Sequence, residues 1–312
     1  MITTLTPFIR RLPSWLYKLG AQSYIDKEFP RHVFIETTAT CNLSCSYCPR
    51  EKVKADMDFN LFKSIVDECN WYGPRSYSLH LFGEPLLYPH IIEAINYIKA
   101  YDKDNTVLLT TNGTLLNQFA ERLLECRVDR IIWSWRKNNF SLRTIEILKR
   151  IGMVRLLIEE TPKEEFEVWS KFPRVEIKHL HNYGGKIDLS KWKNSDGMGT
   201  LERRDALSGL ASVETISNGS DLSRYPCYHL WLAPAVRFNG DIVICCADPH
   251  GESSVGKYGE ISLAEFWRGN VLKRLREEHL NNKPTGICVG CNVWSTYPDL
   301  FFNYQKKCNH KQ

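Results

Sequence analysis

Hydrophobic and polar residues alternate along residues 32–181 in a repeating order of strand-like and helix-like segments. Six segments rich in branched and aromatic residues are expected to be strands: 32–38, 75–82, 105–113, 128–135, 154–160 and 175–181. Between them, apolar residues recur every three or four positions and predict five helices: 60–71, 90–101, 115–124, about 141–151 and about 163–171. Because parallel strands need crossover connections, this order predicts an α/β fold, a partial (β/α)6 TIM-like barrel with its helices outside.

The pattern changes after the barrel. A hairpin is expected over 231–246, because Asn239-Gly240 is a strong two-residue turn signal between apolar runs. Ser262 with Glu265 three residues later predicts a capping box that opens a helix. The apolar side of that helix is expected to comprise Leu263, Phe266, Trp267 and Val271. Hairpin and helix together predict a small C-terminal domain.

These patterns divide the chain into four expected units. Residues 1–31 read as a short helical extension, and the barrel occupies residues 32–185. Residues 186–224 are polar and bear Ser, Gly and Asn, so we expect a linker or a lid over the active site. The hairpin-plus-helix domain then spans residues 225–312.

Composition and charge narrow the function classes. The 312 residues are 43% hydrophobic and 25% charged, which is typical of a globular protein with a sizeable core. The net charge of +5 is spread along the chain, and no basic stripe with interleaved aromatic residues predicts nucleic-acid binding. No apolar run is long enough to span a membrane, and the chain start lacks a signal-peptide pattern. We therefore expect a cytoplasmic protein without a membrane span.

The eleven cysteines are the most informative feature of the composition. Clustered thiols in a reducing compartment more often hold metal or perform redox chemistry than form disulfides. Cys41, Cys45 and Cys48 have the spacing C-x3-C-x2-C on the loop after the first strand. Three thiolates can ligate three irons of a four-iron cluster and leave the fourth iron without a protein ligand. The alternative is a zinc site that borrows a distant fourth ligand.

This cysteine loop resembles the signature of the radical SAM superfamily, in which an aromatic residue, here Tyr47, usually precedes the third cysteine. The resemblance implies that S-adenosylmethionine (SAM) chelates the open iron. It also implies that an electron from the cluster cleaves SAM to a 5′-deoxyadenosyl radical, which abstracts hydrogen from a substrate C–H bond. The cofactor supplies that chemistry, and the protein supplies orientation and exclusion of water.

Further resemblance lies on the loops after the next strands. Gly83, Glu84 and Pro85 follow the second strand, where the superfamily carries a segment that receives the SAM amino group. A carboxylate suits an ammonium, and glycine permits close approach. By position after the third and fourth strands, Asn112 and Ser134 either contact SAM or have ordinary turn and core roles. For Glu84 the alternative is a solvated turn carboxylate.

A second set of thiols lies in the C-terminal unit. Cys227, a hairpin with Gly240-x4-Cys245, and then Cys288-x2-Cys291 resemble the SPASM/twitch auxiliary-cluster domain. The resemblance implies one closed auxiliary [4Fe–4S] cluster with these four cysteines as ligands. A structural zinc ribbon is the alternative, because four thiolates suit zinc equally well.

Several other residues are open to more than one interpretation. Cys246 adjoins a predicted ligand and points to the opposite face if the hairpin strand persists there. Its possible roles are a spare ligand, a packed thiol or a hydrogen-atom donor. Cys69 and Cys126 lie within helical patterns and are expected to be buried thiols. His80 lies near the predicted active face, where a lone histidine is more often structural than catalytic.

In length and cysteine layout the chain resembles twitch enzymes such as the dehydrogenase that oxidises 2-deoxy-scyllo-inosamine. The resemblance implies two-electron oxidation of an alcohol on a sugar or aminocyclitol, with the auxiliary cluster as electron acceptor and no assigned catalytic base. Epimerisation and peptide (RiPP) maturation are alternatives within the same chemistry, and a zinc-binding interaction protein is the alternative of a different class. Expected partners are a small-molecule substrate or a peptide, and an electron donor such as flavodoxin or ferredoxin.

Overall fold

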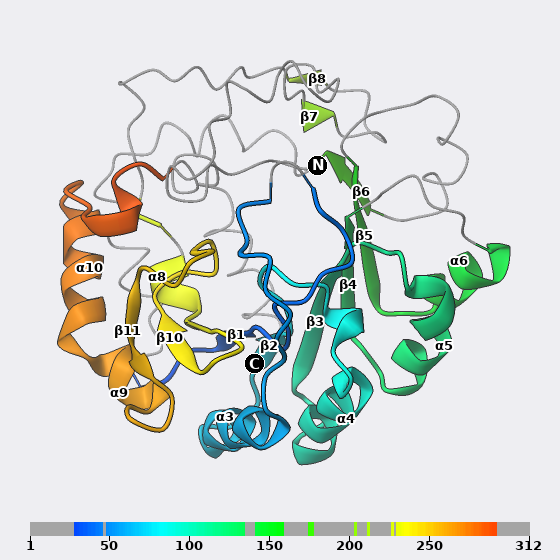
Figure 1. Ribbon diagram of the computed structural model, residues 1–312, viewed down its shortest axis with the longest axis horizontal. Helices are drawn as coiled ribbons and strands as arrows, with labels where there is room; N and C mark the ends of the chain where they lie inside the picture. The colour runs from blue at the N-terminus through cyan, green and yellow to red at the C-terminus, as the bar shows by residue number, and fades with distance from the viewer. Residues whose placement is uncertain are drawn as a thin grey trace, which may run out of the picture.

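The computed structural model describes eight ranges of the chain: 28–45, 48–134, 141–158, 174–177, 203–204, 211–212, 226–227 and 229–291. Its main feature is an open, curved, nine-stranded sheet in the order β11-β10-β9-β1-β2-β3-β4-β5-β6 (Figure 1). Six strands are parallel and follow the chain order: β1 (His32–Ile35), β2 (Ser76–Ser78), β3 (Thr106–Thr111), β4 (Arg130–Ser134), β5 (Met153–Ile158) and β6 (Arg174–Ile177). The predicted α/β class and partial six-stranded barrel are confirmed.

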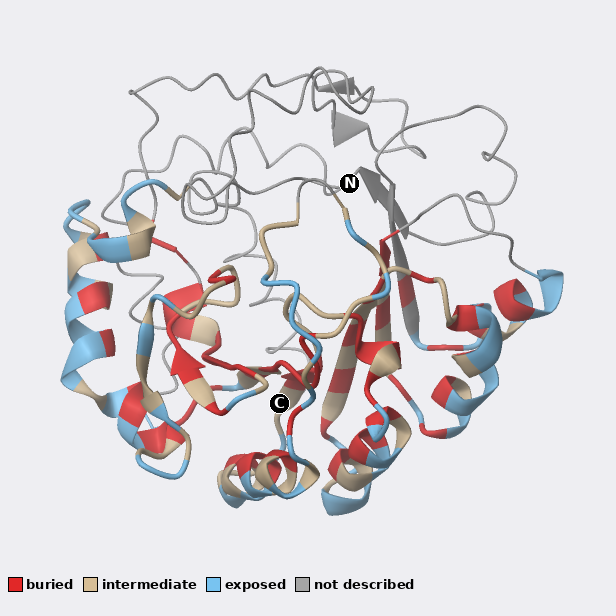
Figure 2. Cartoon of the chain, in the orientation of Figure 1, coloured by how far each residue is buried: buried red, intermediate tan, exposed pale blue. Residues whose placement is uncertain are grey.

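Helices cover the outer face of these strands (Figure 1). They are α3 (Phe59–Trp71), α4 (Ile91–Tyr101), α5 (Leu116–Glu125) and α6 (Leu142–Lys149). Side chains alternate along each strand, so that in β3 Val107 and Leu109 are fully buried while Leu108 between them is only half-buried. Figure 2 shows the resulting band of buried residues between sheet and helices. The helix expected near 163–171 lies outside the described residues.

The C-terminal hairpin continues the barrel sheet instead of forming a separate one. Strand β9 (Ala235–Val236) pairs in parallel with β1, and β10 (Asp241–Val243) and β11 (Ser254–Lys257) follow it antiparallel. The predicted turn is present, with Gly240 in the left-handed region at a φ of 87°. Because β9 lies against β1, the chain after residue 234 is held directly beside the start of the barrel.

The predicted helix after the hairpin is present but shorter than expected. The capping box of Ser262 and Glu265 is complete, and it opens α9 (Leu263–Arg268). Gly269 adopts an extended backbone, with φ −69° and ψ 158°, so the helix ends there and a second helix, α10 (Asn270–Leu280), begins. The expectation that Val271 lies on the apolar side is wrong, because this side chain is 37% exposed and Leu272 is buried in its place.

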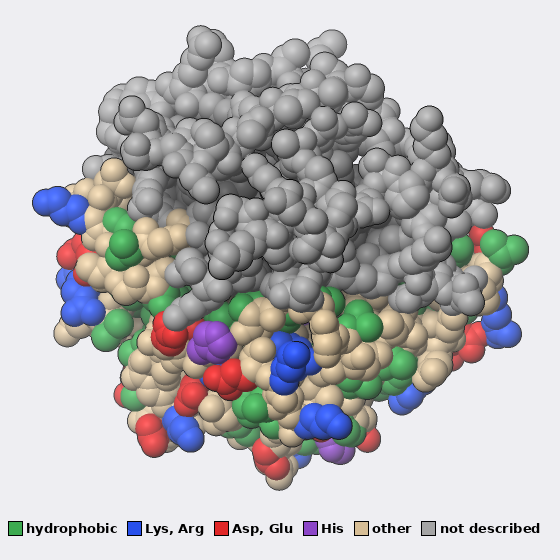
Figure 3. Space-filling model, turned by 45° about the horizontal axis from the view of Figure 1, so that its top comes forward, with side chains coloured by type: hydrophobic (Ala, Val, Ile, Leu, Met, Phe, Trp, Pro, Cys, Tyr) green, Lys and Arg blue, Asp and Glu red, His purple; other side chains and the backbone are tan. Residues whose placement is uncertain are grey.

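Parts of the expected domain plan lie outside the described residues. These include residues 1–27 of the N-terminal extension and most of the 186–224 linker or lid, where the two short strands β7 (Arg203–Arg204) and β8 (Ala211–Ser212) pair with each other. The domain boundaries therefore stay predictions. Within the described residues, no helix is long and apolar enough to cross a membrane. On the face shown in Figure 3, acidic and basic side chains of the described residues are interspersed.

Candidate functional site

The loop after β1 carries Cys41, Cys45 and Cys48, all half-buried. A turn brings the last two together, since the Cys48 backbone N–H donates to the Cys45 carbonyl at 3.1 Å. Arg50 closes the loop: its guanidinium donates to the carbonyls of Cys41 at 3.5 Å and Leu43 at 3.2 Å. The arginine at the end of the cysteine motif thus holds the loop in one shape.

The three thiols of this loop are close enough to influence one another. Burial raises the pKa of Cys48, the Arg50 charge opposes that rise, and the neighbouring Cys45 and Cys41 raise the pKa further. Thiolate is the form that binds metal, and a cationic iron centre would relieve the mutual repulsion of three thiolates. The donor set therefore fits the three-cysteine side of an iron–sulfur cluster.

The loop after β3 is joined to the cysteine loop by side-chain amides. Asn112 Nδ2 donates to Asn42 Oδ1 at 2.9 Å and to Cys41 Sγ at 3.8 Å. Asn42 Nδ2 in turn donates to Thr114 Oγ1 at 2.8 Å. The predicted residue Asn112 therefore lies beside the first cysteine, although the two are 71 positions apart in the sequence.

Glu84 holds the loops after β2 and β3 together. Its side chain is 2% exposed and accepts from Thr111 Oγ1 at 2.6 Å, from the Asn112 N–H at 2.7 Å and from the Leu86 N–H at 3.2 Å. Burial raises the pKa of this carboxyl, and the three hydrogen bonds oppose the rise. The solvated-turn alternative is therefore wrong, because the carboxylate is buried and positions Asn112. Direct contact of Glu84 with SAM stays a prediction.

Gly83 permits the close approach of two loops. A Cβ at this position would lie 2.0 Å from the Thr38 carbonyl oxygen and 3.0 Å from the Thr40 carbonyl oxygen. The next residue, Glu84, donates its backbone N–H to Thr40 at 2.8 Å. Pro85 follows as the first residue of a short 3-10 helix, where its missing N–H costs no hydrogen bond. The Gly-Glu-Pro segment thus lies directly against the chain that leads to the first cysteines.

A second group of thiols forms from three separate segments. Cys227 precedes α8 (His229–Leu232), Cys245 follows β10, and Cys288 and Cys291 follow α10. The pKa of Cys227 is raised by burial and then by the charges of Cys245, Cys291 and Cys288. Burial, and then the charges of Cys245, Cys291 and Glu278, raise the pKa of Cys288 to about 12. Four thiols that repel one another when ionised fit a cationic iron–sulfur cluster.

In the part of the chain that the structure describes, no three His, Cys, Asp or Glu side chains lie in positions that could hold a metal ion.

Family models match the two halves of this arrangement. The model of the radical SAM superfamily matches residues 35–134, and that of the SPASM iron–sulfur cluster-binding domain matches residues 227–292. The chain carries a radical SAM domain followed by a SPASM domain. These domains bring SAM, a SAM-binding [4Fe–4S] cluster and an auxiliary [4Fe–4S] cluster, as predicted.

Several known proteins are similar to this chain, and the solved structures among them share its fold. An uncharacterized protein of Treponema pallidum is 24% identical over 81% of this chain and 72% of its own length. The structure of BtrN in complex with AdoMet and 2-DOIA has a TM-score of 0.60 at 18% identity, covering 84% of this chain and 92% of BtrN. Streptococcus suis SuiB bound to the precursor peptide SuiA has a TM-score of 0.56 at 16% identity, covering 90% of this chain and 74% of SuiB.

Two predicted contacts of this radical SAM domain remain predictions. Ser134 is the last residue of β4 and is 9% exposed, so it lies at the expected strand end but is buried. Tyr47 lies outside the described residues. The structure adds Arg50, which lies two residues after the third cysteine and which no sequence pattern singled out.

Cys246 points toward the auxiliary site, not away from it. Strand β10 ends at Val243, and the chain then turns, with the Asp248 N–H donating to the Cys245 carbonyl at 3.3 Å. The Cys246 thiol hydrogen-bonds to that of Cys245 and lies 3.6 Å from Nδ1 of His229. The opposite orientation was expected only if the strand continued to residue 246, and this condition is not met because β10 ends at Val243.

His80, two residues after β2, provides a pH-dependent element. His80 Nδ1 accepts from the Thr110 N–H at 3.2 Å, and Nε2 lies 2.9 Å from Thr110 Oγ1. Burial lowers the pKa of His80 to about 4. With both ring nitrogens engaged, His80 is a structural residue, in line with the prediction.

We expect His80 to make the fold less stable as the pH falls. His80 takes up a proton near pH 6.5 in the unfolded chain, but only near pH 4 in the folded chain. The free energy of unfolding therefore decreases as the pH falls from 6.5 to 4. Between pH 7 and 5 the wild type should lose about 2 kcal/mol more unfolding free energy than His80→Gln. Anaerobic denaturant titrations at both pH values measure this, with the half-exposed His90→Gln as control. Equal losses in wild type and His80→Gln would contradict the prediction.

Proposed function

We propose that this radical SAM enzyme oxidises an alcohol on a small polar substrate, such as a sugar or an aminocyclitol. The observation that carries the proposal is the gathering of Cys227, Cys245, Cys288 and Cys291 at one site. Four thiolates leave no iron of a cubane open, so the auxiliary cluster is suited to accepting an electron and not to binding substrate.

Clustered reduced thiols also suit the cytoplasm, which we propose as the location.

The first site has three cysteines instead of four, which would leave one iron of its cluster open to SAM. Cys41, Cys45 and Cys48 are proposed to hold the SAM-binding cluster, which together with SAM supplies a 5′-deoxyadenosyl radical. Arg50 fixes the shape of this loop through the Cys41 and Leu43 carbonyls. The same loop is held from the β3 side, where an amide donor lies 3.8 Å from Cys41 Sγ.

The proposed reaction balances as a two-electron oxidation. The substrate carbinol loses one hydrogen atom to the 5′-deoxyadenosyl radical, the hydroxyl proton to a base and one electron to the auxiliary cluster. The products are a carbonyl compound, 5′-deoxyadenosine and methionine. An external donor such as flavodoxin or ferredoxin supplies the electron that SAM cleavage consumes. No residue of this chain is assigned as the base.

A second candidate, epimerisation, has a specific observation in its favour. The Cys246 thiol contacts His229, and the His229 ring lies 6.2 Å from the ring of Phe34 on β1. This contact places a thiol beside the first strand of the barrel, where it could return a hydrogen atom to a substrate radical. The likeness to peptide-bound SuiB keeps peptide maturation as the third candidate.

Product analysis separates the first two candidates. Reconstituted enzyme, SAM and reductant are incubated in D2O with a panel of polyols, aminocyclitols and short peptides. Oxidation is expected to give 5′-deoxyadenosine and a carbonyl product in equal amounts, with no new C–D bond and no change in Cys246→Ala. Deuterium in the product that disappears in Cys246→Ala, but not in the control Cys126→Ala, would establish epimerisation. No 5′-deoxyadenosine with any compound would remove the support for both.

A further inference from the structure

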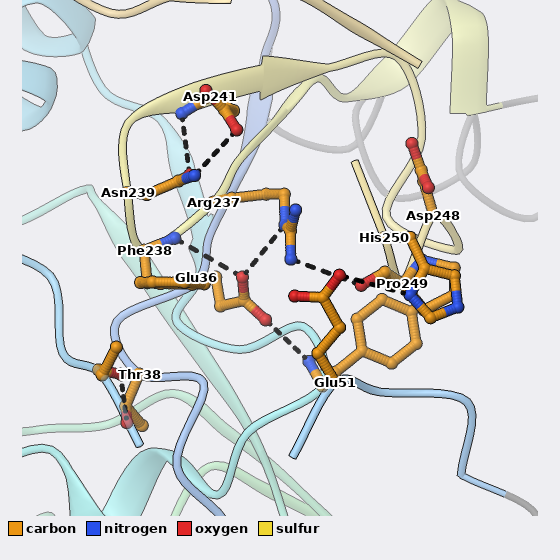
Figure 4. Close-up of polar contacts among 12 residues, drawn as sticks. Glu36, Thr38, Glu51, Arg237, Phe238, Asn239, Asp241, Asp248, Pro249 and His250 are labelled. Carbon is orange, nitrogen blue, oxygen red and sulfur yellow. Dashed lines mark hydrogen bonds and ion pairs between the residues drawn. The ribbon is translucent and has the colours of Figure 1, made fainter. Parts of the chain in front are cut away.

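A buried ion pair connects the radical SAM domain to the SPASM domain. Glu36 directly follows β1 and Arg237 directly follows β9, and these two strands are hydrogen-bonded neighbours. Arg237 Nε lies 3.7 Å from Glu36 Oε2, with the two side chains 8% and 2% exposed (Figure 4). The sequence places these charges 201 positions apart, and neither belongs to a cysteine motif.

Each partner of the pair also reaches a segment that leads to a cofactor site. Glu36 accepts at 3.4 Å from the N–H of Phe82, the residue before Gly83, and at 3.4 Å from the N–H of Phe238. Arg237 Nη2 donates to the Pro249 carbonyl at 3.3 Å. Glu36 therefore contacts the base of the Gly-Glu-Pro loop, and Arg237 contacts the turn that follows Cys245.

The turn that receives Arg237 is shaped for it. Gly251 has a φ of 70°, which favours glycine, and a Cβ there would lie 2.5 Å from Arg237 Nη1, so a larger residue would displace the guanidinium. Asp248 holds the turn from inside by accepting from the N–H groups of Glu252 at 3.2 Å and Ser253 at 2.7 Å. The Asp248 N–H donates to the Cys245 carbonyl at 3.3 Å, so the turn that binds Arg237 is hydrogen-bonded to a predicted cluster ligand.

The pair also borders the first cysteine loop. Glu36, Arg50, Glu51 and Arg237 line one small cavity together with Phe82. Glu51, on the cysteine loop, lies 3.6 Å from His250 Nδ1 on the SPASM turn (Figure 4). The two loops that carry the thiol groups thus meet around the ion pair.

The energetics favour a positioning role over simple stabilisation. Burial raises the pKa of Glu36, and the Arg237 charge and two backbone hydrogen bonds oppose the rise. Replacing a buried ion pair by uncharged side chains is often neutral for stability, whereas removing one partner leaves an uncompensated buried charge. A glutamine at position 36 keeps one acceptor oxygen, so the uncharged pair loses the Arg237 contact to Pro249 and one of the two Glu36 contacts, to Phe82 or to Phe238.

We propose that Glu36 and Arg237 are positioning residues that fix the Cys245 turn relative to the first cysteine loop, and so set the separation and orientation of the two clusters. This inference rests on the proposed function, in which an electron passes to the auxiliary cluster. The pair acts through its contacts to Phe82, Phe238 and Pro249, which lie on the segments that lead to the predicted ligands.

The test compares Glu36→Gln/Arg237→Met with wild type. The double variant buries no lone charge, so its iron content and melting temperature are expected to stay close to wild type. With both clusters chemically reduced, the magnetic interaction between them, measured as the spin-relaxation rate of each signal, is expected to shift. The single variant Arg237→Met should show the same shift with a lower melting temperature. Lys99→Met/Asp129→Asn removes another partly buried ion pair, with its atoms 2.6 Å apart, and is the matched control.

Failure of the positioning role can be distinguished from failure of the proposed alcohol oxidation. Relaxation rates that are the same in wild type and double variant, or no interaction in either, would overturn the positioning role. So would an equal shift in the control variant. Because the measurement uses chemical reduction and no substrate, failure to oxidise any alcohol would count against the proposed function and leave the relaxation result standing.

Discussion

Replacing Cys41, Cys45 and Cys48 together by alanine is expected to lower the iron content from about eight to about four atoms per chain and to abolish 5′-deoxyadenosine formation. The physical reason is that the first cluster loses all its protein ligands, while the auxiliary site draws its thiols from other segments. Iron and sulfide analysis with electron paramagnetic resonance measures both effects, and SAM should perturb only the signal that the variant lacks.

Cys126→Ala is the control for the loss of a thiol as such. Cys126 is 5% exposed, and its thiol donates to the Leu123 carbonyl at the end of α5, so its removal should leave iron content unchanged. Retention of about eight irons in the triple variant would mean that other residues ligate the first cluster. Zinc at the second site would remove the electron acceptor and exclude the dehydrogenase proposal.

Gly83→Ala is expected to destabilise the loops at the first cysteine site strongly. The added Cβ would lie 2.0 Å from the Thr38 carbonyl oxygen, which belongs to the main chain and has no rotamer through which to move away. We expect a loss of about 3 kcal/mol of unfolding free energy, because the loop must separate from the segment before Cys41. SAM cleavage should fall more strongly than iron content at the auxiliary site.

The matched control for Gly83 is Gly73→Ala. Nothing lies within 4 Å of the Cβ at Gly73, which has a φ of 87°, so this variant carries only the cost of a left-handed alanine, about 1 kcal/mol. Thermal unfolding and a 5′-deoxyadenosine assay on both variants measure the difference. Full SAM cleavage by Gly83→Ala would show that the loop contact is not needed.

Local patterns in the sequence determined much of this protein. Periods of two and 3.6 residues indicated the strands and helices, because each element buries one face wherever it lies in the fold. The Asn239-Gly240 turn and the Ser262–Glu265 capping box depend on residues a few positions apart, and both are present. The spacing of Cys41, Cys45 and Cys48 predicted the first domain, because a ligand set on one loop is itself a local pattern. The second domain was predicted from its resemblance to a known cysteine pattern, since its four thiols lie on three separate segments.

Only the tertiary structure decided how distant segments meet. Pairing of β9 with β1 depends on which strand edge remains free, and no local period records it. Glu84, on the loop after β2, accepts a hydrogen bond from the loop after β3 because these two loops lie at the same end of a parallel sheet. The pairing of β9 with β1 also brings Glu36 and Arg237 together at adjacent strand ends. A charge in a sequence carries no record of its partner, since burial and distance decide which ions meet and both arise only when the sheet has formed.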